Sequence, residues 1–365
     1  MKFTLNQREL VSALSIVSKA TNLRTTMEIL RGIHIEAKDN MIILKSHDLS
    51  LSIIMQVPAF VEKEGSVLID SSLFSDIIRK LPGEPITMEI KDESLFLVCQ
   101  SSRYRLSMMD QENYPQIPQI NEGSSIKIEQ GAFSSLVKMT KFAVGQDETR
   151  PILTGSLVEV KDGKMKMVSV DGFTIAIKTV PILEGNPCQV VIPGRNLSEI
   201  EKIIGTGEEE MEILVSSNHV VFNFDGITII SKVLEGNYIN YERVIDTGFD
   251  TKVEIPIDEF YRALDRVALL ANRSKSYIVN FDFSDRQVDI SSSSELGLAK
   301  ESISTVNHGE PLVINFNPNY LLRALRVMEE DSMVFAMGGS HKPCKITQKD
   351  KDDYEYYVVP IRTPQ

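Results

Sequence analysis

Two aspartates at matching places in the chain are the first candidates for chemistry. Asp48 and Asp171 each separate two strand-like runs, and paired carboxylates can act as acid and base in a hydrolase or transferase. An aspartate before glycine, as at Asp171, is more often a turn residue, because its side chain bonds the backbone that follows. We interpret both as turn residues, and keep as the rival an enzyme whose repeated units build a cleft around them.

The other nucleophiles and potential metal ligands lack the spacing of a catalytic or metal site. Cys99, Cys188 and Cys344 are far apart, and the five histidines have no zinc-ligand pattern. The glycine-rich GTGEEE from Gly205 follows a predicted helix, and its carboxylates would repel a phosphate. The sequence contains no GxxxxGK[ST] loop, GxSxG elbow or HExxH helix. We therefore expect no metal, no cofactor and no catalysis.

The elements that must position these residues occur three times. An alternating strand, a polar break and an amphipathic helix begin at Phe3, Ile126 and Val253. Apolar residues recur at three- and four-residue spacing in each helix, which is typical of one buried face. The three stripes are Leu10, Leu14 and Val17; Phe133, Val137 and Thr140; and Phe260, Leu264 and Val267. One supersecondary unit has been triplicated.

A second helical pattern follows at a similar offset in every unit. It begins near Asp70, Pro193 and Asn317, and strand-like runs lie between the two helices. Two helices cannot cover both faces of about eight strands, so we expect α+β domains with the helices on one side of the sheets. The pattern lapses before each restart, which predicts three domains at residues 1–122, 123–248 and 249–365.

Composition and charge restrict the class of protein. The chain has 365 residues, of which 42% are hydrophobic, and no apolar run approaches a membrane span or a signal peptide. We therefore expect a cytoplasmic protein. A net charge of −12 argues against a protein that coats nucleic acid by general attraction.

Basic residues nevertheless share the solvent faces of the first helices. They are Arg8 and Lys19, then Lys138 and Lys141, and finally Arg262, Arg266 and Arg273. These charges could simply keep exposed helices soluble. A local basic lining within an acidic body would also hold a nucleic-acid backbone weakly and without sequence preference, which is compatible with sliding.

Three units in a row leave exposed sheet edges at both ends of the chain. Exposed edges favour further pairing, and joining the array to a second copy would remove them. Equivalent joins would give a ring with twofold symmetry, in which the head of one chain meets the tail of the other.

The segments MKFTLNQRELVSALSIVSKATNLR, QDETRPILTG, VSVDGFTIAIK, VIPGRNLSEI and YYVVPIRT resemble the bacterial sliding clamp family, the β subunit of DNA polymerase III. The similarity covers the whole chain. It implies a homodimeric ring of six similar domains, with helices lining the hole and sheets outside. Such a ring encircles duplex DNA and acts as a processivity factor. The implied partners are DNA polymerase III, its clamp loader and other proteins with a hydrophobic clamp-binding motif.

The resemblance also implies a pocket for the partner's peptide between the second and third domains. Its lining would be Leu153, Val170, Gly172, Ile175, Ile239, Arg243, Val244, Pro343, Val358, Val359, Pro360, Ile361 and Arg362. Aliphatic walls would bury an extended apolar peptide and an arginine would orient it. Ile239 stands where the family commonly has proline, and residues 363–365 extend past the usual end, so the pocket shape and peptide preference stay open.

The family positions that face DNA correspond to Arg24, Gln146, Arg150 and Arg195. For the join between chains, we hypothesise that one group of residues on the first domain meets a second group on the third domain of the other chain. The first group is Arg103, Arg105 and Leu106, and the second is Leu269, Leu270, Glu295 and Glu301. A further alternative is a scaffold of repeated domains with no role on DNA.

Overall fold

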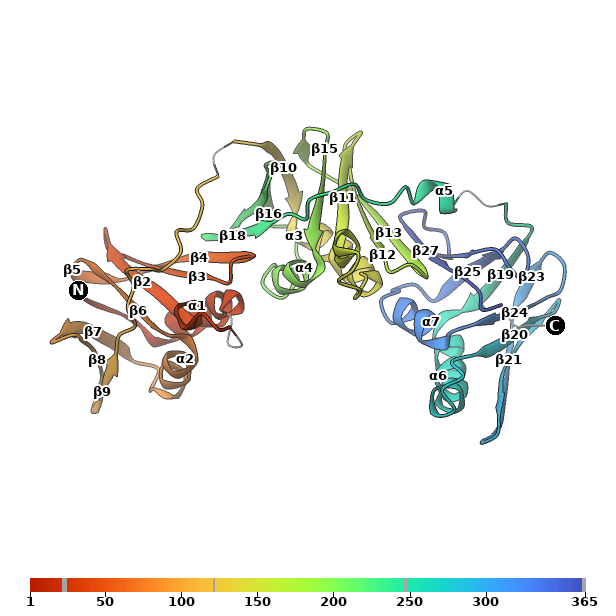
Figure 1. The fold of residues 1–365 in the computed structure, drawn as a ribbon, viewed down its shortest axis with the longest axis horizontal. Coiled ribbons are helices and arrows are strands. Elements are labelled where there is room, and N and C mark those ends of the chain that lie inside the picture. The colour runs from red at the N-terminus through yellow and green to blue at the C-terminus, as the bar shows by residue number, and fades with distance from the viewer. Residues whose placement is uncertain (22–24, 121, 246–247, 363–365) are drawn as a thin grey trace.

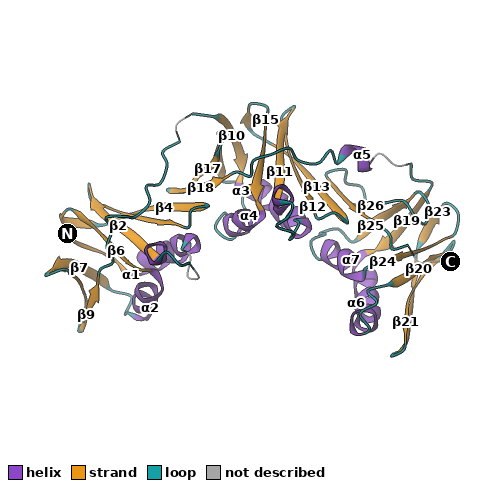
Figure 2. Cartoon of the chain, viewed as in Figure 1, coloured by secondary structure: helices purple, strands orange, loops and turns teal. Residues whose placement is uncertain are grey.

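The structure is a computed structural model that describes residues 1–21, 25–120, 122–245 and 248–362. The chain forms an arc of three similar units, which we call repeats 1, 2 and 3 (Figure 1). Helices lie on the concave side of the arc and sheets on the convex side (Figure 2). The end of repeat 1 that carries β9 and the end of repeat 3 that carries β21 are the two ends of the arc.

Repeat 1 contains, in chain order, β1 (Lys2–Asn6), α1 (Gln7–Val17), β2 (Gly32–Lys38), β3 (Met41–His47), β4 (Leu51–Pro58), β5 (Phe60–Lys63), β6 (Gly65–Asp70), α2 (Ser71–Lys80), β7 (Pro85–Lys91), β8 (Ser94–Cys99) and β9 (Ser102–Ser107). Repeat 2 contains β10 (Ser124–Glu129), α3 (Gln130–Thr140), β11 (Gly155–Lys161), β12 (Lys164–Val170), β13 (Thr174–Pro181), β14 (Glu184–Gly185), β15 (Cys188–Pro193), α4 (Gly194–Glu201), β16 (Glu210–Val215), β17 (His219–Phe224) and β18 (Ile227–Lys232).

Repeat 3 follows the short helix α5 (Glu242–Ile245) and contains β19 (Thr251–Pro256), α6 (Ile257–Arg273), β20 (Val279–Phe283), β21 (Gln287–Ser294), β22 (Gly297–Ser304), β23 (Val306–His308), β24 (Leu312–Phe316), α7 (Pro318–Leu325), β25 (Ser332–Met337), β26 (Cys344–Gln348) and β27 (Tyr354–Val358). Short 3-10 helices span Ser18–Ala20, Glu28–Arg31, Lys141–Ala143 and Pro151–Thr154. Within the described residues each repeat therefore has nine strands and two main helices in the same order.

Local sequence explains where these elements begin and which face they bury. Asn6 caps α1 by accepting the Arg8 amide at 2.8 Å, and Asp70 caps α2 by accepting the Leu73 amide at 2.8 Å. All nine residues of the three predicted stripes are buried, which confirms the predicted core face of α1, α3 and α6. In its described residues each repeat has one strand more than the eight that the sequence predicted. The additional strand is the short β5, β14 or β23, which has too few residues to show an alternating pattern.

Hydrogen-bonded sheets continue from one repeat into the next. Repeat 1 contributes β6-β2-β3-β4 and repeat 2 contributes β18-β17-β16-β10-β14 to one nine-stranded sheet, which is joined by antiparallel pairing of β4 with β18. Repeats 2 and 3 form a second nine-stranded sheet in the same manner, through antiparallel pairing of β13 with β27. The α+β class, with helices on one side of the sheets, is confirmed.

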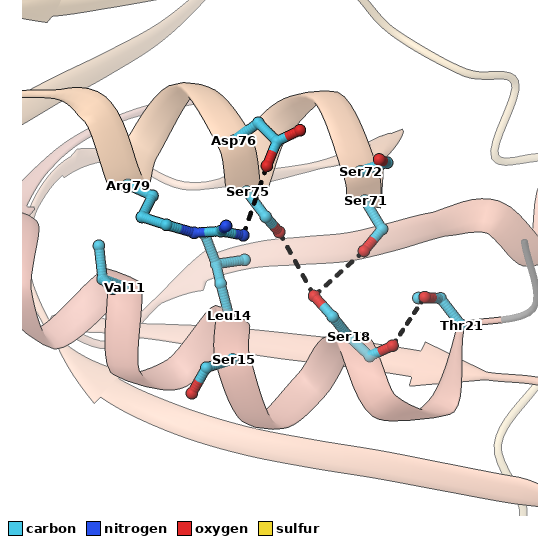
Figure 3. Close-up of a pocket in the computed structure, with 10 residues that line it drawn as sticks. All are labelled: Val11, Leu14, Ser15, Ser18, Thr21, Ser71, Ser72, Ser75, Asp76 and Arg79. Atoms are coloured by element: carbon cyan, nitrogen blue, oxygen red, sulfur yellow. Dashed lines mark hydrogen bonds and ion pairs between the residues drawn. The ribbon is translucent and has the colours of Figure 1, made fainter.

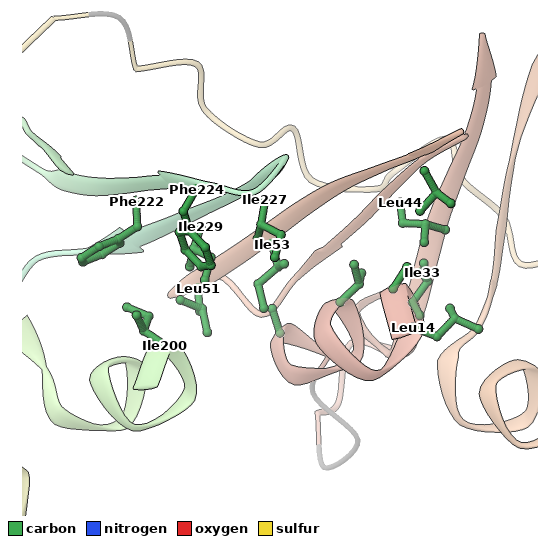
Figure 4. Close-up of a cluster of buried hydrophobic side chains, with 14 of the residues drawn as sticks. Leu14, Ile33, Leu44, Leu51, Ile53, Ile200, Phe222, Phe224, Ile227 and Ile229 are labelled. Carbon is green, nitrogen blue, oxygen red and sulfur yellow. The ribbon is translucent and has the colours of Figure 1, made fainter. Parts of the chain in front are cut away.

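The apolar core also crosses the join between repeats 1 and 2. One cluster of buried side chains contains Leu14 and Ile53 of repeat 1 and Phe222 and Ile229 of repeat 2. Figure 4 shows Ile53 near Ile229, where β4 runs beside β18. A shared core and a shared sheet fix the two repeats to each other, because parting them would expose apolar surface and break backbone hydrogen bonds together.

Candidate functional site

A small apolar cavity lies at the join between repeats 2 and 3, and its lining includes Val244 of α5. α5 itself lies on the convex side of the arc (Figure 1). The volume of the cavity is about 140 Å³. The lining comes from the β12–β13 turn, the segment before repeat 3 and the ends of β26 and β27. It consists of Val170, Gly172, Phe173, Thr174, Ile175, Ile239, Val244, Pro343, Tyr357, Val358 and Val359. A cavity of this size and chemistry suits one or two aliphatic side chains.

The β12–β13 turn that forms one wall is built by Asp171. Its Oδ1 accepts the amides of Phe173 at 3.0 Å and Thr174 at 2.8 Å. Gly172 adopts φ +92°, a backbone conformation that glycine accepts without strain. The other carboxylate oxygen of Asp171 accepts a hydrogen bond from Arg323 of α7 at 3.1 Å. Asp171 is thus a turn residue, as predicted. It also connects repeat 2 to repeat 3 through Arg323.

Aromatic side chains extend this wall at the join. Phe173 stacks on Tyr320 of α7 with ring centroids 5.6 Å apart, and Arg323 lies 5.1 Å over the Tyr320 ring. Arg323 also donates to the Phe142 carbonyl oxygen at 3.1 Å. Burial raises the pKa of Tyr357, so its phenol stays neutral in the wall. The resulting surface is apolar at its centre and is held by the partly buried polar contacts of Arg323 with Asp171 and Phe142.

The structure brings most of the predicted pocket residues together around this cavity. Those in its lining are Val170, Gly172, Ile175, Ile239, Val244, Pro343, Val358 and Val359. Leu153 lies in the buried cluster beneath it, with Val170 and Ile175. The predicted residues outside the lining are the exposed Arg243 of α5 and the chain-end segment Pro360, Ile361 and Arg362. The Ile361 amide donates to the Asn315 carbonyl oxygen at 2.8 Å, which anchors that segment to repeat 3.

Sequence reasoning missed Phe173, Thr174 and Tyr357 in the lining. Phe173 and Thr174 lie inside the same VSVDGFTI segment, so the segment itself was the available signal. Tyr357 enters the pocket because it pairs with Ile175 across the β13–β27 join. Tyr357 lies inside the quoted segment YYVVPIRT, but its place in the lining depends on the register of two strands far apart in the chain.

The corresponding turn at the join between repeats 1 and 2 is built by Asp48. Its Oδ1 accepts the amides of Ser50 at 3.0 Å and Leu51 at 2.7 Å, and its Oδ2 lies 3.0 Å from Arg195 of α4. Asp48 is therefore also a turn residue with an interdomain arginine. Arg195, a predicted DNA-facing residue, remains 66% exposed while it makes this ion pair.

Of the other three predicted DNA-facing residues, the structure describes Gln146 and Arg150. Gln146 and Arg150 are exposed in the loop between α3 and the 3-10 helix Pro151–Thr154. The Arg150 amide donates to the Asp147 carbonyl oxygen at 3.1 Å. Arg24 lies outside the described residues.

Several basic side chains on the concave helices pair with carboxylates. Lys138 of α3 lies 2.7 Å from Glu329, and Lys141 lies 2.7 Å from Glu201 of α4. Arg266 of α6 binds Glu301 of β22 through two hydrogen bonds of 2.8 and 2.9 Å. The carboxylates come from neighbouring elements, which helical spacing cannot indicate. Such pairing lowers the net attraction of this face for phosphates.

A groove of about 370 Å³ separates α1 from α2 on the concave side (Figure 3). Its polar lining is mainly hydroxyl groups, and Ser18 Oγ lies 3.3 Å from Ser75 Oγ and 3.2 Å from Ser71 Oγ. Arg79 pairs with Asp76 at 3.4 Å. Ser18, Ser71 and Ser75 bond to one another, and the Ser15 and Thr21 hydroxyls donate to backbone carbonyl oxygens. No histidine or lysine is among the lining residues to activate them. The groove gives no support to the rival enzyme.

The described residues contain neither a group of potential metal ligands nor a helix suited to cross a membrane. In residues 1–21, 25–120, 122–245 and 248–362, no three His, Cys, Asp or Glu side chains cluster where they could hold a metal ion. No helix in those same ranges is long and apolar enough to cross a membrane.

The residues predicted for the join between chains lie at the two ends of the arc. Arg103 and Arg105 are exposed on β9, whereas Leu106 is buried. Leu269 of α6 is 67% exposed, and Leu270 is half-buried. Glu295 is exposed in the β21–β22 turn, and Glu301 binds Arg266 within the chain.

Comparisons with known proteins agree along the whole chain. Models of the N-terminal, central and C-terminal domains of the DNA polymerase III beta subunit match residues 1–118, 127–240 and 242–362. The beta sliding clamps of Staphylococcus epidermidis RP62A and Staphylococcus aureus N315 are each 32% identical over 375 residues, with all of both chains covered.

The similar solved structures are also sliding clamps or DNA polymerase III beta subunits. The DNA polymerase sliding clamp of Bacillus subtilis is 30% identical, superposes with a TM-score of 0.96 and covers all of both chains. A DNA polymerase III beta subunit described as putative, from Eubacterium rectale, is 30% identical with a TM-score of 0.95 and covers 99% of each chain. The chain therefore belongs to the family of the DNA polymerase III beta subunit, the bacterial DNA sliding clamp.

Proposed function

We propose that two copies of this chain close head to tail into a ring that encircles duplex DNA and tethers DNA polymerase III to it. The family membership supports a role as processivity clamp. The single observation that carries the ring is the repetition of one join along the chain. The last strand of repeat 2 pairs with β4, and the last strand of repeat 3 pairs with the equivalent β13.

One join of this kind is left open at each end of the arc. Within the described residues, β9 pairs with β8 alone and β22 pairs with β21 alone. β9 is the last strand of repeat 1, and β22 is the equivalent of β4 and β13 in repeat 3. Pairing β9 of one chain with β22 of a second copy would thus repeat the two internal joins and remove both open edges.

The internal joins also predict the register of the closing one. Met55 pairs with Ile227 at the first join, and Lys178 pairs with Tyr354 at the second. Hairpin pairings make Glu301 equivalent to Met55 and Lys178, and Ser102 equivalent to Ile227 and Tyr354. The expected pairs are Ser102 with Glu301, Arg103 with Lys300, Tyr104 with Ala299, Arg105 with Leu298 and Leu106 with Gly297.

This register refines the hypothesis about which charges meet. Side chains alternate along a strand, so Arg103 would share the convex face with Lys300, while Glu301 points towards Arg266 of α6. Lys300 already pairs with Asp289 at 2.8 Å. We propose that Asp289, rather than Glu301, offsets the repulsion between Arg103 and Lys300, because like charges directly opposite each other destabilise a sheet.

Engineered disulfides test the ring. In a Cys188→Ser background, Tyr104→Cys with Ala299→Cys should give covalent dimers on oxidation, because opposite residues in a sheet come within disulfide range. The matched control is Tyr104→Cys with Leu298→Cys, whose side chains would point to opposite faces. Equal cross-linking of both pairs, or of neither, would contradict the register.

The same cross-linked dimer tests encirclement of DNA. Dimers loaded on a nicked circle by a clamp loader and then oxidised should stay on the circle at high salt, because topology rather than charge holds them. They should leave when a restriction enzyme linearises the circle. Retention on linear DNA, or loss from the intact circle at high salt, would overturn the ring.

We further propose that the cavity between repeats 2 and 3 takes an aliphatic side chain of an extended peptide from the polymerase, the clamp loader or other clamp-binding proteins. The apolar lining supports burial of that side chain, and Phe173 with Val244 offers an exposed apolar rim. Arg243 of α5 would orient the peptide by donating hydrogen bonds to acidic or carbonyl groups of the peptide. In this proposal the chain acts in the cytoplasm as a non-catalytic tether and needs no cofactor of its own.

A further inference from the structure

Each join between repeats contains a second contact besides the paired strands. It connects the β-turn after Asp48 or its equivalent to the second helix of the neighbouring repeat. The turn residue is the second after Asp48, Asp171 or Ser294, and the helix residue is the third after the N-cap of α2, α4 or α7. The turn positions are Ser50, Phe173 and Leu296, and the helix positions are Leu73, Asn196 and Tyr320.

Both internal joins use this pair of positions, but with different chemistry. At the join between repeats 1 and 2, Asn196 Nδ2 donates to Ser50 Oγ at 3.0 Å and to the Ser50 carbonyl oxygen at 3.2 Å. At the join between repeats 2 and 3, Tyr320 stacks on Phe173. One contact is polar and the other is aromatic, although the backbone arrangement is the same.

The two positions that have no neighbour of this kind within the described chain are both leucine. Leu73 on α2 is 55% exposed, and Leu296 in the β21–β22 turn is 65% exposed. They lie at opposite ends of the arc, on the elements that would meet if a second copy closed the ring. Leu269 is also exposed and aligns with Phe142, whose carbonyl accepts Arg323 at the internal join. An aliphatic contact is thus prepared on both ends.

We propose that Leu73 of one chain packs against Leu296 of the second copy, and that this aliphatic pair makes the closing join selective for its own two ends. The inference rests on the proposed ring. Chains of similar repeats risk pairing the wrong repeats during folding and assembly. Three different contacts at one position would oppose such errors, because a specific interface also penalises the wrong partner.

The penalty follows from the contacts of Asn196, which is 2% exposed. Its Nδ2 group donates to Ser50 and to Ser231 Oγ at 2.8 Å. Opposite Phe173 or Leu296 it would lose the hydroxyl acceptor of Ser50, while the carbonyl oxygen of the turn residue and Ser231 Oγ would remain as acceptors. The buried amide would then lie against an apolar side chain with one hydrogen bond fewer, which is unfavourable. Conversely, Leu73 opposite Ser50 would bury no aliphatic partner. The polar Ser50–Asn196 pair is therefore kept apart from the two apolar pairs, and the aromatic and aliphatic pairs differ from each other in shape.

Exchange of side chains between joins tests the inference. Leu73→Asn and Leu296→Ser should each raise the dimer dissociation constant about 100- to 10,000-fold, since the ring has two joins and each join loses the burial of a leucine side chain. Leu73→Asn with Leu296→Ser reproduces the Asn196–Ser50 pair. The fold increase in the dissociation constant of this double variant should be at least about tenfold smaller than the product of the fold increases of the two single variants. Sedimentation equilibrium measures all three values.

Leu183→Asn is the matched control, because Leu183 is 52% exposed in a turn of repeat 2 and should not change dimerisation. Single substitutions that change the dissociation constant no more than Leu183→Asn does, or effects that simply multiply, would overturn the leucine contact. If the Tyr104–Ala299 disulfide still forms in such a case, the ring stands and only this contact fails. If that disulfide does not form even with both leucines present, the ring proposal itself fails.

Discussion

The two joins within the chain share a backbone design but offer opposite surfaces. Val170 and Ile175 pair across the β12–β13 hairpin and line the apolar cavity. Their equivalents at the first join are His47 and Ser52, which pair across β3–β4 with His47 Nδ1 2.7 Å from Ser52 Oγ. Val359 and Pro343 are likewise matched by Lys232 and His219. If the cavity binds a peptide as proposed, a few side chains, and not the fold, decide which join accepts it.

The largest expected effect comes from placing the polar pair in the apolar join. Val170→His with Ile175→Ser should weaken binding of a hydrophobic polymerase-tail peptide by at least about 100-fold, because the cavity would lose its aliphatic wall. The fold should persist, since the same pair is accommodated at the first join. Calorimetric titration measures the affinity. The reverse exchange, His47→Val with Ser52→Ile, is the control and should leave it unchanged; equal loss in both variants would remove the functional distinction between the joins.

A smaller difference is expected between the two turn aspartates. Asp171→Ala and Asp48→Ala each remove two acceptors for backbone amides, which should cost about 1 to 3 kcal/mol. Asp171→Ala should cost more, because Arg323 is 35% exposed while Arg195 is 66% exposed and its ion pair is more screened. Thermal unfolding followed by circular dichroism compares the two variants.

Peptide affinity separates the two aspartates further. Only Asp171→Ala should also lower the affinity for the peptide, since the turn at Asp171 forms one wall of the cavity. Retention of full peptide affinity by Asp171→Ala would show that the wall does not depend on this turn.

The smallest effect concerns pH. Burial lowers the pKa of His47 below its ordinary value, with further lowering by Lys232 and His219, while a backbone hydrogen bond and Asp48 oppose the shift. His47 therefore binds fewer protons in the folded chain than in the unfolded one. Stability should fall as pH drops below about 6.5, where the unfolded histidine takes up its proton.

The exchange of His47 for valine isolates this effect. His47→Val with Ser52→Ile should reduce the loss of melting temperature between pH 7.5 and pH 5.5, by a margin corresponding to less than about 1 kcal/mol. Val170 and Ile175 do not titrate, so the second join has no comparable group at these positions. An unchanged pH dependence in the exchange variant would assign the effect to His34 or His219, whose pKa values are also lowered by burial.

Periodicity and repetition predicted the architecture, because they are properties of neighbouring residues. The stripe Phe133, Val137 and Thr140 indicates a buried helix face without knowledge of what covers it. Asp171 before Gly172 likewise indicates a turn, since the bonds from Asp171 to Phe173 and Thr174 are local. The class of fold and the turn role of Asp171 therefore followed from the sequence, and Asp48 is its counterpart in the repeat.

Contacts between distant segments could not be predicted in this way. The sequence offered Lys138 and Lys141 as unopposed charges, but Glu329 and Glu201 reach them from other elements. Most of the pocket came from the family resemblance, and the resemblance did not supply Tyr357, which depends on the register of β13 with β27. Charge pairing and strand register across joins are decided by tertiary packing, which local patterns do not encode.

The unbroken sheets have a mechanical consequence. Backbone hydrogen bonds connect β14 to β6 through one join and β15 to β23 through the other, so bending the arc at either join would break a row of bonds together. Each chain should therefore behave as a rigid arc. In the proposed ring, opening would therefore occur by separation of β9 from β22 at a join between chains, and not by separation of repeats within a chain.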